Sequence, residues 1–247
     1  MTKRQGELVA VMTIERRTSS SGLADSRGLR LVVTVAGRTV FDRSLCTPAR
    51  CGPATQQRLS LHDLSGGSLP QVMLDSYSGG AHCCFATLVV LPGGPHAGRL
   101  LAHAWGDPGY ALQRHDGRAY LVSADDRFAY AFTSFAASGL PVQAWVIGPG
   151  GAFTDVTGSR PDLVRADAAR WWTAYTGERG RPDSDVRGVL GAWCADEDRL
   201  GLQRRCTAAL ASALAKGYLA GPGFWPEGAS FVALLRRDLR AWGYPTG

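Results

Sequence analysis

Residues 156–175 read VTGSRPDLVRADAARWWTAY, and the spacing of the apolar side chains changes within this stretch. From residue 161 onward the apolar side chains recur every three or four positions, which predicts a helix, and Pro161 followed by Asp162 suits a first helical turn. Further stretches with helical spacing are 186–196, 202–219 and 231–242, the last with Ser230 as its predicted cap. Residues 158–247 are therefore expected to form a helical bundle.

Before residue 157 the chain is built of short apolar runs, several of them separated by clusters of glycine and proline. The strands that these runs predict cover 8–14, 29–35, 39–41, 58–62, 71–77, 84–91, 99–105, 120–123, 128–132 and 142–147. Many short strands with frequent turn signals are typical of antiparallel sheets. The order of strands first and helices second predicts an α+β fold, with an antiparallel β unit (propeller-like or a sandwich) over 6–157 and the helical bundle over 158–247 packed on it.

The charge of the chain does not point to a nucleic-acid surface. The net charge is +6 and the pI about 9.2, but Lys3 and Lys216 are the only lysines, asparagine is absent, and the arginines are scattered. The use of arginine in place of lysine, together with the absence of asparagine, indicates a bias in the base composition of the gene. The net charge is therefore no sign of a nucleic-acid partner. The longest apolar runs have the length of strands, so no membrane span is expected.

The cysteines indicate the compartment. They form three local pairs: Cys46 and Cys51, Cys83 and Cys84, and Cys194 and Cys206. An even number without zinc-finger spacing predicts disulfides made in an oxidising compartment, and a Cys194–Cys206 bond would join two successive helices across a turn at Gly201. An extracellular or cell-envelope location is therefore expected, with a trimmed signal peptide because residues 1–7 hold no apolar core. The alternative is six reduced thiols in the cytosol.

Two segments repeat faintly at an offset of about 50 residues, namely 63–75 and 114–125. Both resemble the calcium loop of FG-GAP and VCBS-type extracellular repeats, an Asp-rich loop that runs into a strand. The first segment keeps Asp63 but has Ser65, Gly67 and Gln71 at the other ligand positions; the second keeps Asp116 but has Leu112, Arg114 and Tyr120. Calcium takes six to eight oxygen ligands. The resemblance therefore implies a scaffold with degenerate calcium sites, and no cofactor is expected.

Residues 77–84 read YSGGAHCC and are the most distinctive stretch of the chain. They resemble a signature of uncharacterised secreted bacterial proteins, particularly actinobacterial ones; this resemblance implies architecture and compartment, and no activity. His82, Cys83 and Cys84 allow three interpretations: a structural disulfide, a soft metal site, or a cysteine nucleophile with a histidine base. His82 is poorly placed for Cys83, because neighbouring side chains on a strand point to opposite faces.

Paired carboxylates are the remaining catalytic signal. Asp125 and Asp126 suit a general acid and base, although the adjacent Arg127 also fits a turn with an ion pair. Together with Asp75 and His82 they are the candidate catalytic residues of a secreted hydrolase. Since no catalytic motif is present, the leading interpretation is a non-enzymatic extracytoplasmic binding or structural module that acts on another protein or a cell-envelope polymer. A thiol-dependent or metal-binding module is the third alternative. A deep cleft that collects the four candidates would favour the enzyme.

Overall fold

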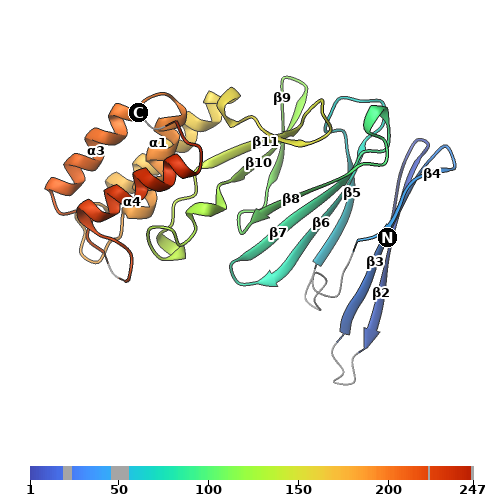
Figure 1. Cartoon of the computed structure of the whole chain (residues 1–247), viewed down its shortest axis with the longest axis horizontal. Helices are drawn as coiled ribbons and strands as arrows, with labels where there is room; N and C mark the ends of the chain where they lie inside the picture. Colours follow the sequence, from blue (N-terminus) through green and yellow to red (C-terminus); the bar gives the residue numbers. More distant parts are fainter. Residues whose placement is uncertain (19–23, 46–55, 222, 246–247) are drawn as a thin grey trace. The chain divides into compact units, whose positions relative to one another are not determined.

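A computed structural model describes residues 1–18, 24–45, 56–221 and 223–245 (Figure 1). The chain forms two compact units by its internal contacts. The first unit contains residues 1–122 and 145–154, and the second contains 123–144 and 155–247. The chain therefore passes from one unit to the other three times. The sequence assigned residues 123–144 to the β unit. By their internal contacts they belong to the same unit as the helices.

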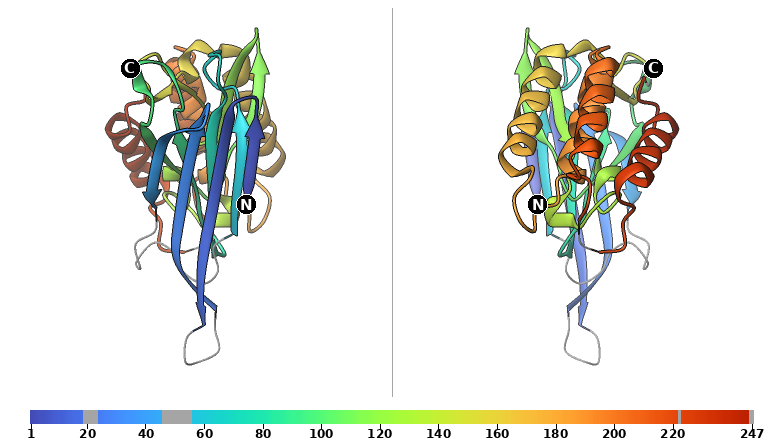
Figure 2. Two further views of the ribbon diagram at one scale, coloured as in Figure 1. Left: turned by 90° about the vertical axis from the view of Figure 1, so that its right-hand side faces the viewer. Right: turned by 90° about the vertical axis from the view of Figure 1, so that its left-hand side faces the viewer.

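Within these described ranges the strands form three four-stranded antiparallel sheets, and in each sheet the strands follow one another in chain order. The first sheet contains β1 (Thr2–Gln5), β2 (Leu8–Thr18), β3 (Ala24–Val35) and β4 (Arg38–Ser44), which run side by side in Figure 2, left. The second contains β5 (Gln56–His62), β6 (Gln71–Gly80), β7 (Cys83–Val90) and β8 (Leu100–Gly106). The third contains β9 (Ala111–His115), β10 (Arg118–Ala124), β11 (Val142–Ile147) and β12 (Phe153–Asp155). Four-stranded meanders of this kind are also the building blocks of propellers.

The second sheet contributes to a hydrophobic core on each of its two faces. Val72 and Leu74 of β6 belong to one core, which they share with Leu8, Leu31 and other residues of the first sheet. Met73, between them in sequence, belongs to a second core with residues of β7 to β11. Successive side chains of a strand point to opposite faces, so this sheet separates the two cores.

The described part of the second unit contains four helices (Figure 2, right). They are α1 (Pro161–Glu178), α2 (Arg187–Arg199), α3 (Gln203–Ala215) and α4 (Gly228–Ala241), and short 3₁₀ turns lie at Gly94–His96, Asp126–Phe128, Phe135–Ala137 and Thr157–Ser159. The expected α+β order of strands and helices is confirmed. In the part of the chain that the structure describes, no helix combines the length and the apolar character needed to cross a membrane.

Two details of the secondary structure were predicted wrongly. The strand expected at 128–132 is absent, because the Asp125 side chain accepts a hydrogen bond from the backbone N–H of Arg127 (3.2 Å) and starts a 3₁₀ turn there. Ser230 does not cap α4: the helix begins at Gly228, and Ser230 already lies in the first turn. β1, β9 and β12 were not predicted; they have five residues or fewer.

A glycine in α2 allows the helix to lie against the chain segment before β11. A Cβ atom on Gly188 would lie 2.3 Å from the carbonyl oxygen of Ala137 and 2.8 Å from the Cα of Ser138. We expect Gly188→Ala to lower the free energy of unfolding in urea by about 1–3 kcal/mol, because the backbone at Ala137 and Ser138 must move to admit the methyl group. Gly177→Ala is the control: that position, in α1, has nothing within 4 Å, so alanine should stabilise by up to about 1 kcal/mol. Equal effects of the two substitutions would contradict the contact.

Candidate functional site

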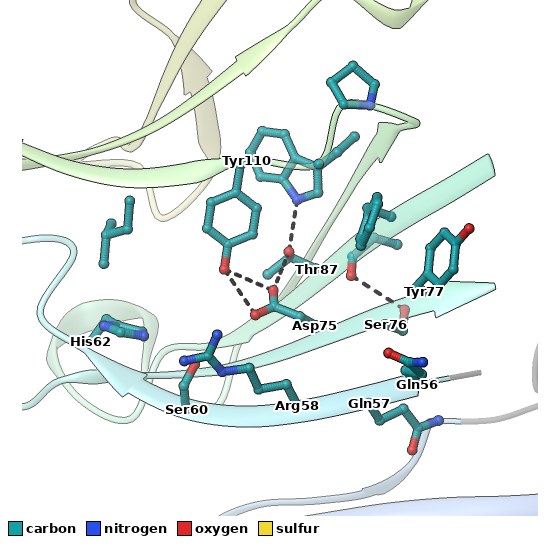
Figure 3. Close-up of a pocket in the computed structure, with 16 residues that line it drawn as sticks. Gln56, Gln57, Arg58, Ser60, His62, Asp75, Ser76, Tyr77, Thr87 and Tyr110 are labelled. Atoms are coloured by element: carbon teal, nitrogen blue, oxygen red, sulfur yellow. Dashed lines mark hydrogen bonds between the residues drawn. The ribbon is translucent and has the colours of Figure 1, made fainter. Parts of the chain in front are cut away.

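A cavity of about 500 Å³ lies on one face of the second sheet, in the first unit (Figure 3). The strands β5, β6, β7 and β8 and the segment 108–112, which leads into β9, line it. Its lining combines charged, polar and aromatic side chains, among them Arg58, His62, Asp75, Tyr77, Phe85, Thr87, Trp105 and Tyr110. Ligand sites in proteins have this size and this mixture of apolar walls with a few placed polar groups.

The carboxylate of Asp75 is the centre of the hydrogen bonding in this cavity. Thr87 Oγ1 donates to its Oδ1 (2.6 Å), and the Tyr110 hydroxyl lies 2.9 Å from Oδ1 and 3.0 Å from Oδ2. Figure 3 shows both hydroxyls converging on the carboxylate. Trp105 Nε1 in turn donates to Thr87 Oγ1 (2.8 Å), so the proton of the threonine is directed towards Asp75. Thr87 and Trp105 are buried and hold Asp75 in one orientation.

Two pairs of aromatic rings form the walls. Tyr77 and Phe85 are neighbours across β6 and β7 and stack with ring centroids 4.6 Å apart. Trp105 and Tyr110 lie 5.0 Å apart. Gly109 is in the left-handed region (φ +61°), and a Cβ atom there would lie 3.4 Å from the ring of Phe85. Because glycine adopts this conformation without strain, it allows the chain to turn over Phe85 and bring in Tyr110.

The titratable neighbours of Asp75 have distinct roles. Burial raises the pKa of Tyr110 well above its ordinary value, and the negative charge of Asp75 raises it further, so the phenol remains a proton donor. Burial also lowers the pKa of His62; Asp75 opposes this effect, while Arg58 and Arg114 add to it. The His62 ring is therefore uncharged at neutral pH. Arg58 is exposed and lies directly opposite Asp75 in the β5–β6 register.

Of the four candidate catalytic residues, Asp75 alone is among the residues that line the cavity. His82 lies exposed in the two-residue turn between β6 and β7. Asp125 belongs to the second unit, where it is buried, forms an ion pair with Arg127 (2.5 Å) and accepts a hydrogen bond from Tyr244 (2.9 Å). The alternative of a turn with an ion pair is thus confirmed at this position. Asp126 is half-buried in the same turn.

The cysteines are described in part. Cys194 of α2 and Cys206 of α3 form the expected disulfide, with their Cα atoms 4.9 Å apart. Cys84 is also disulfide-bonded, and a disulfide sulfur is not the thiolate that ligates metals. Cys46 and Cys51 lie outside the described residues, as does the side chain of Cys83.

The polar groups of the first calcium-like loop bond to one another. Asp63 Oδ1 accepts from the backbone N–H of Gly66 (2.8 Å). Gln71 accepts from the N–H of Leu64 (2.7 Å) through its Oε1, and its Nε2 donates to Ser65 Oγ (2.9 Å). An N–H donor therefore lies where a bound cation would need oxygen ligands. Within the described ranges, no group of three or more His, Cys, Asp or Glu side chains is arranged to hold a metal ion.

Comparison with known proteins gives one distant relationship. A curated protein of Synechocystis sp., described as a probable thylakoid lumen protein, is 30% identical to this chain over 149 residues. The match covers 53% of this chain and 40% of that protein, so the chain spans about two fifths of the length of this relative. No family profile and no solved structure matches the chain.

The sequence indicated Asp75 but not its partners. Thr87 and Tyr110 are 12 and 35 residues away from it, and neither belongs to a recognisable motif. Two signals were available. The sequence 108–110 (Pro-Gly-Tyr) marks a turn that delivers an aromatic residue, and the period of two places Asp75 and Tyr77 on one face of β6.

Proposed function

We propose that this chain is an extracytoplasmic, non-enzymatic binding module and that the cavity around Asp75 is its binding site. The observation that carries the proposal is the oriented carboxylate itself. Asp75 is fixed by two hydroxyl donors and a buried tryptophan, and it lies between aromatic walls. A site prepared in this way recognises a ligand with little loss of conformational entropy. The occupant belongs to another protein or to a cell-envelope polymer.

Two observations support a place outside the cytoplasm. The disulfide between Cys194 and Cys206 is typical of oxidising compartments. The similar protein of Synechocystis is described as a protein of the thylakoid lumen, which is also separate from the cytoplasm.

The cavity favours binding over hydrolysis. A hydrolase of the kind expected from the sequence needs Asp75 together with His82 or with the Asp125–Asp126 pair. The cavity lining contains Asp75 without the other three. The hydroxyls of Thr87 and Tyr110 both donate to Asp75, so the carboxylate is arranged as a fixed hydrogen-bond acceptor. The disulfide at Cys84 likewise disfavours a thiol-dependent module.

Sedimentation with purified cell envelopes of the source organism tests this function. We expect the native protein to sediment with the envelopes. Asp75→Asn should weaken its affinity for them about tenfold, equivalent to about 1.4 kcal/mol. Asp183→Asn is the matched control, because Asp183 is an exposed carboxylate of the second unit in the left-handed region (φ +61°), which asparagine tolerates.

Digestion of the envelopes with a protease before mixing separates a protein partner from a polymer. Thermal unfolding of each variant shows whether Asp75→Asn remains folded. Equal binding by Asp75→Asn and the native protein would place the binding site elsewhere. Failure of the native protein to bind any envelope fraction would contradict the proposed function.

A further inference from the structure

The carboxylate of Asp75 has acceptor positions that the protein does not use. A carboxylate offers about four lone-pair positions. Oδ1 accepts from Thr87 and Tyr110, whereas Oδ2 has the longer contact with Tyr110 alone (3.0 Å). Among the described residues no ion pair to Asp75 occurs, although an arginine is its direct neighbour across the sheet. Oδ2 can therefore accept a hydrogen bond from a ligand in the cavity.

The walls around this carboxylate favour positive charge. The face of an aromatic ring carries partial negative charge and attracts cations within about 6 Å. Tyr77, Phe85, Trp105 and Tyr110 all line the same cavity as Asp75. A carboxylate among aromatic side chains combines an ion-pair partner with a surface that accepts the alkyl part of an amine.

The basic neighbours of Asp75 leave its negative charge available to a ligand. The His62 ring is uncharged at neutral pH, because burial lowers its pKa. Arg58 is exposed, so water screens its charge, and it forms no ion pair with Asp75 in the described part of the chain. Arg58 repels a ligand cation weakly, and this repulsion provides a test of the sign of the ligand's charge.

We propose that the Asp75 cavity recognises its ligand through a primary alkylammonium group, which donates to Asp75 Oδ2 while its alkyl chain lies against the aromatic walls. This inference rests on the proposed function and names the chemistry of the ligand. A neutral hydroxyl can also donate to Oδ2, but it has no positive charge for the aromatic faces to attract. The distinction between the two is therefore electrostatic.

A matched set of small probes tests the charge. In NMR titrations that follow the indole N–H of Trp105, we expect n-butylammonium to bind with a Kd of about 1 mM. We expect n-butanol and butyrate, which have a similar chain without the cation, to bind at least about tenfold more weakly. Binding of n-butanol as tight as that of n-butylammonium would overturn the proposal.

Two substitutions of opposite sign complete the test. Asp75→Asn should weaken n-butylammonium binding by about tenfold, since the ion pair is lost. Arg58→Gln should tighten it by up to about threefold, because the substitution removes a positive charge from the neighbour of Asp75 across the sheet. A ligand that uses Arg58 as a donor would instead bind more weakly to Arg58→Gln, and this result would contradict the ammonium.

The two proposals fail separately. If n-butylammonium does not bind, but Asp75→Asn still abolishes sedimentation with envelopes, the cavity is a binding site for a different chemical group, and the ammonium proposal alone is wrong. If neither the probe nor the envelopes distinguish Asp75→Asn from the native protein, the cavity is not the site.

Discussion

Replacing Asp196 by asparagine is expected to make the protein more stable than the native chain, by an amount that grows from pH 5 to pH 8. Asp196 lies in α2 with none of its side chain exposed, and no N–H or O–H group of the described residues donates a hydrogen bond to its carboxyl oxygens. Its pKa is raised to about 9, first by burial and then by the negative charge of Asp167 and a hydrogen bond with it, against the opposing charges of Arg199 and Arg170. Asp196 is therefore protonated at neutral pH.

Asp167, the neighbour of Asp196, accepts several hydrogen bonds. Its carboxylate accepts hydrogen bonds from the backbone N–H of Val142 (2.8 Å), from Arg170 Nε (2.9 Å) and from Trp171 Nε1 (3.0 Å). These donors stabilise the charged form of Asp167. The proton between the two carboxyl groups consequently belongs to Asp196, which has no such donors.

The direction of the pH dependence follows from the raised pKa. In the unfolded chain Asp196 loses its proton near pH 4, whereas in the folded protein it keeps the proton up to about pH 9. The stability that this proton confers is complete below pH 4 and is lost as the pH rises towards 9. The native protein should therefore lose up to about 1.4 kcal/mol per pH unit relative to Asp196→Asn between pH 5 and 8.

Urea unfolding of both proteins at pH 5, 6, 7 and 8 measures this difference. Asp198 and Glu197 also have pKa values raised by burial, but they are present in both proteins, so their effects cancel in the difference. Asp162→Asn is the control: its difference from the native protein should not change between pH 5 and 8, because the Arg160 guanidinium lowers the pKa of that carboxyl and it is ionised throughout this range. A difference between Asp196→Asn and the native protein that does not change with pH would show that Asp196 does not hold a proton in the folded state.

Removal of the Cys194–Cys206 disulfide is the second large expected effect. The bond closes a loop with a sequence separation of 12 between α2 and α3. Loop-closure entropy predicts that replacing both cysteines by alanine lowers the free energy of unfolding by about 3 kcal/mol. Both sulfurs lie in the core of the second unit, so alanine also leaves a small gap there.

Hydrogen exchange followed by mass spectrometry separates this effect from a general loss of structure. Peptides from α2 and α3 should exchange faster in the double alanine variant, whereas peptides from β5 to β8 should keep their native rates, because they belong to the other unit. Added reductant should change the exchange of α2 and α3 in the native protein but not in the variant. Unchanged exchange of α2 and α3 in the variant would show that the disulfide adds nothing to their stability.

The sequence predicted the class of the fold because its short apolar runs and its helical spacing are separated along the chain. The apolar run at 72–74 and the helical spacing after Pro161 each decide a local structure, and both the strand and the helix were found. The strand expected at 128–132 shows where this reasoning ends. Its apolar residues Phe128 and Phe132 are buried against the helices, and the capping by Asp125 decides the local conformation.

The site was harder to predict than the fold. Asp75 stood out as a carboxylate on an apolar strand, but its significance depends on Thr87, Trp105 and Tyr110, which the register of the sheet and the turn at Gly109 bring to it. The spacing of residues along the sequence does not show which of them pair across neighbouring strands. Asp75 and Asp125 end the two repeated segments, but they belong to different units, and Asp125 is not among the residues that line the cavity.

The three passages of the chain between the units have a consequence for biosynthesis and for the evolution of the gene. Residues 145–154 return to the first unit after 123–144 have entered the second, and Tyr244 belongs to the core of the second unit. The second unit therefore cannot complete its core until the ribosome has released Tyr244. Exchange of one unit by recombination would need three junctions, so the two units are expected to be inherited together.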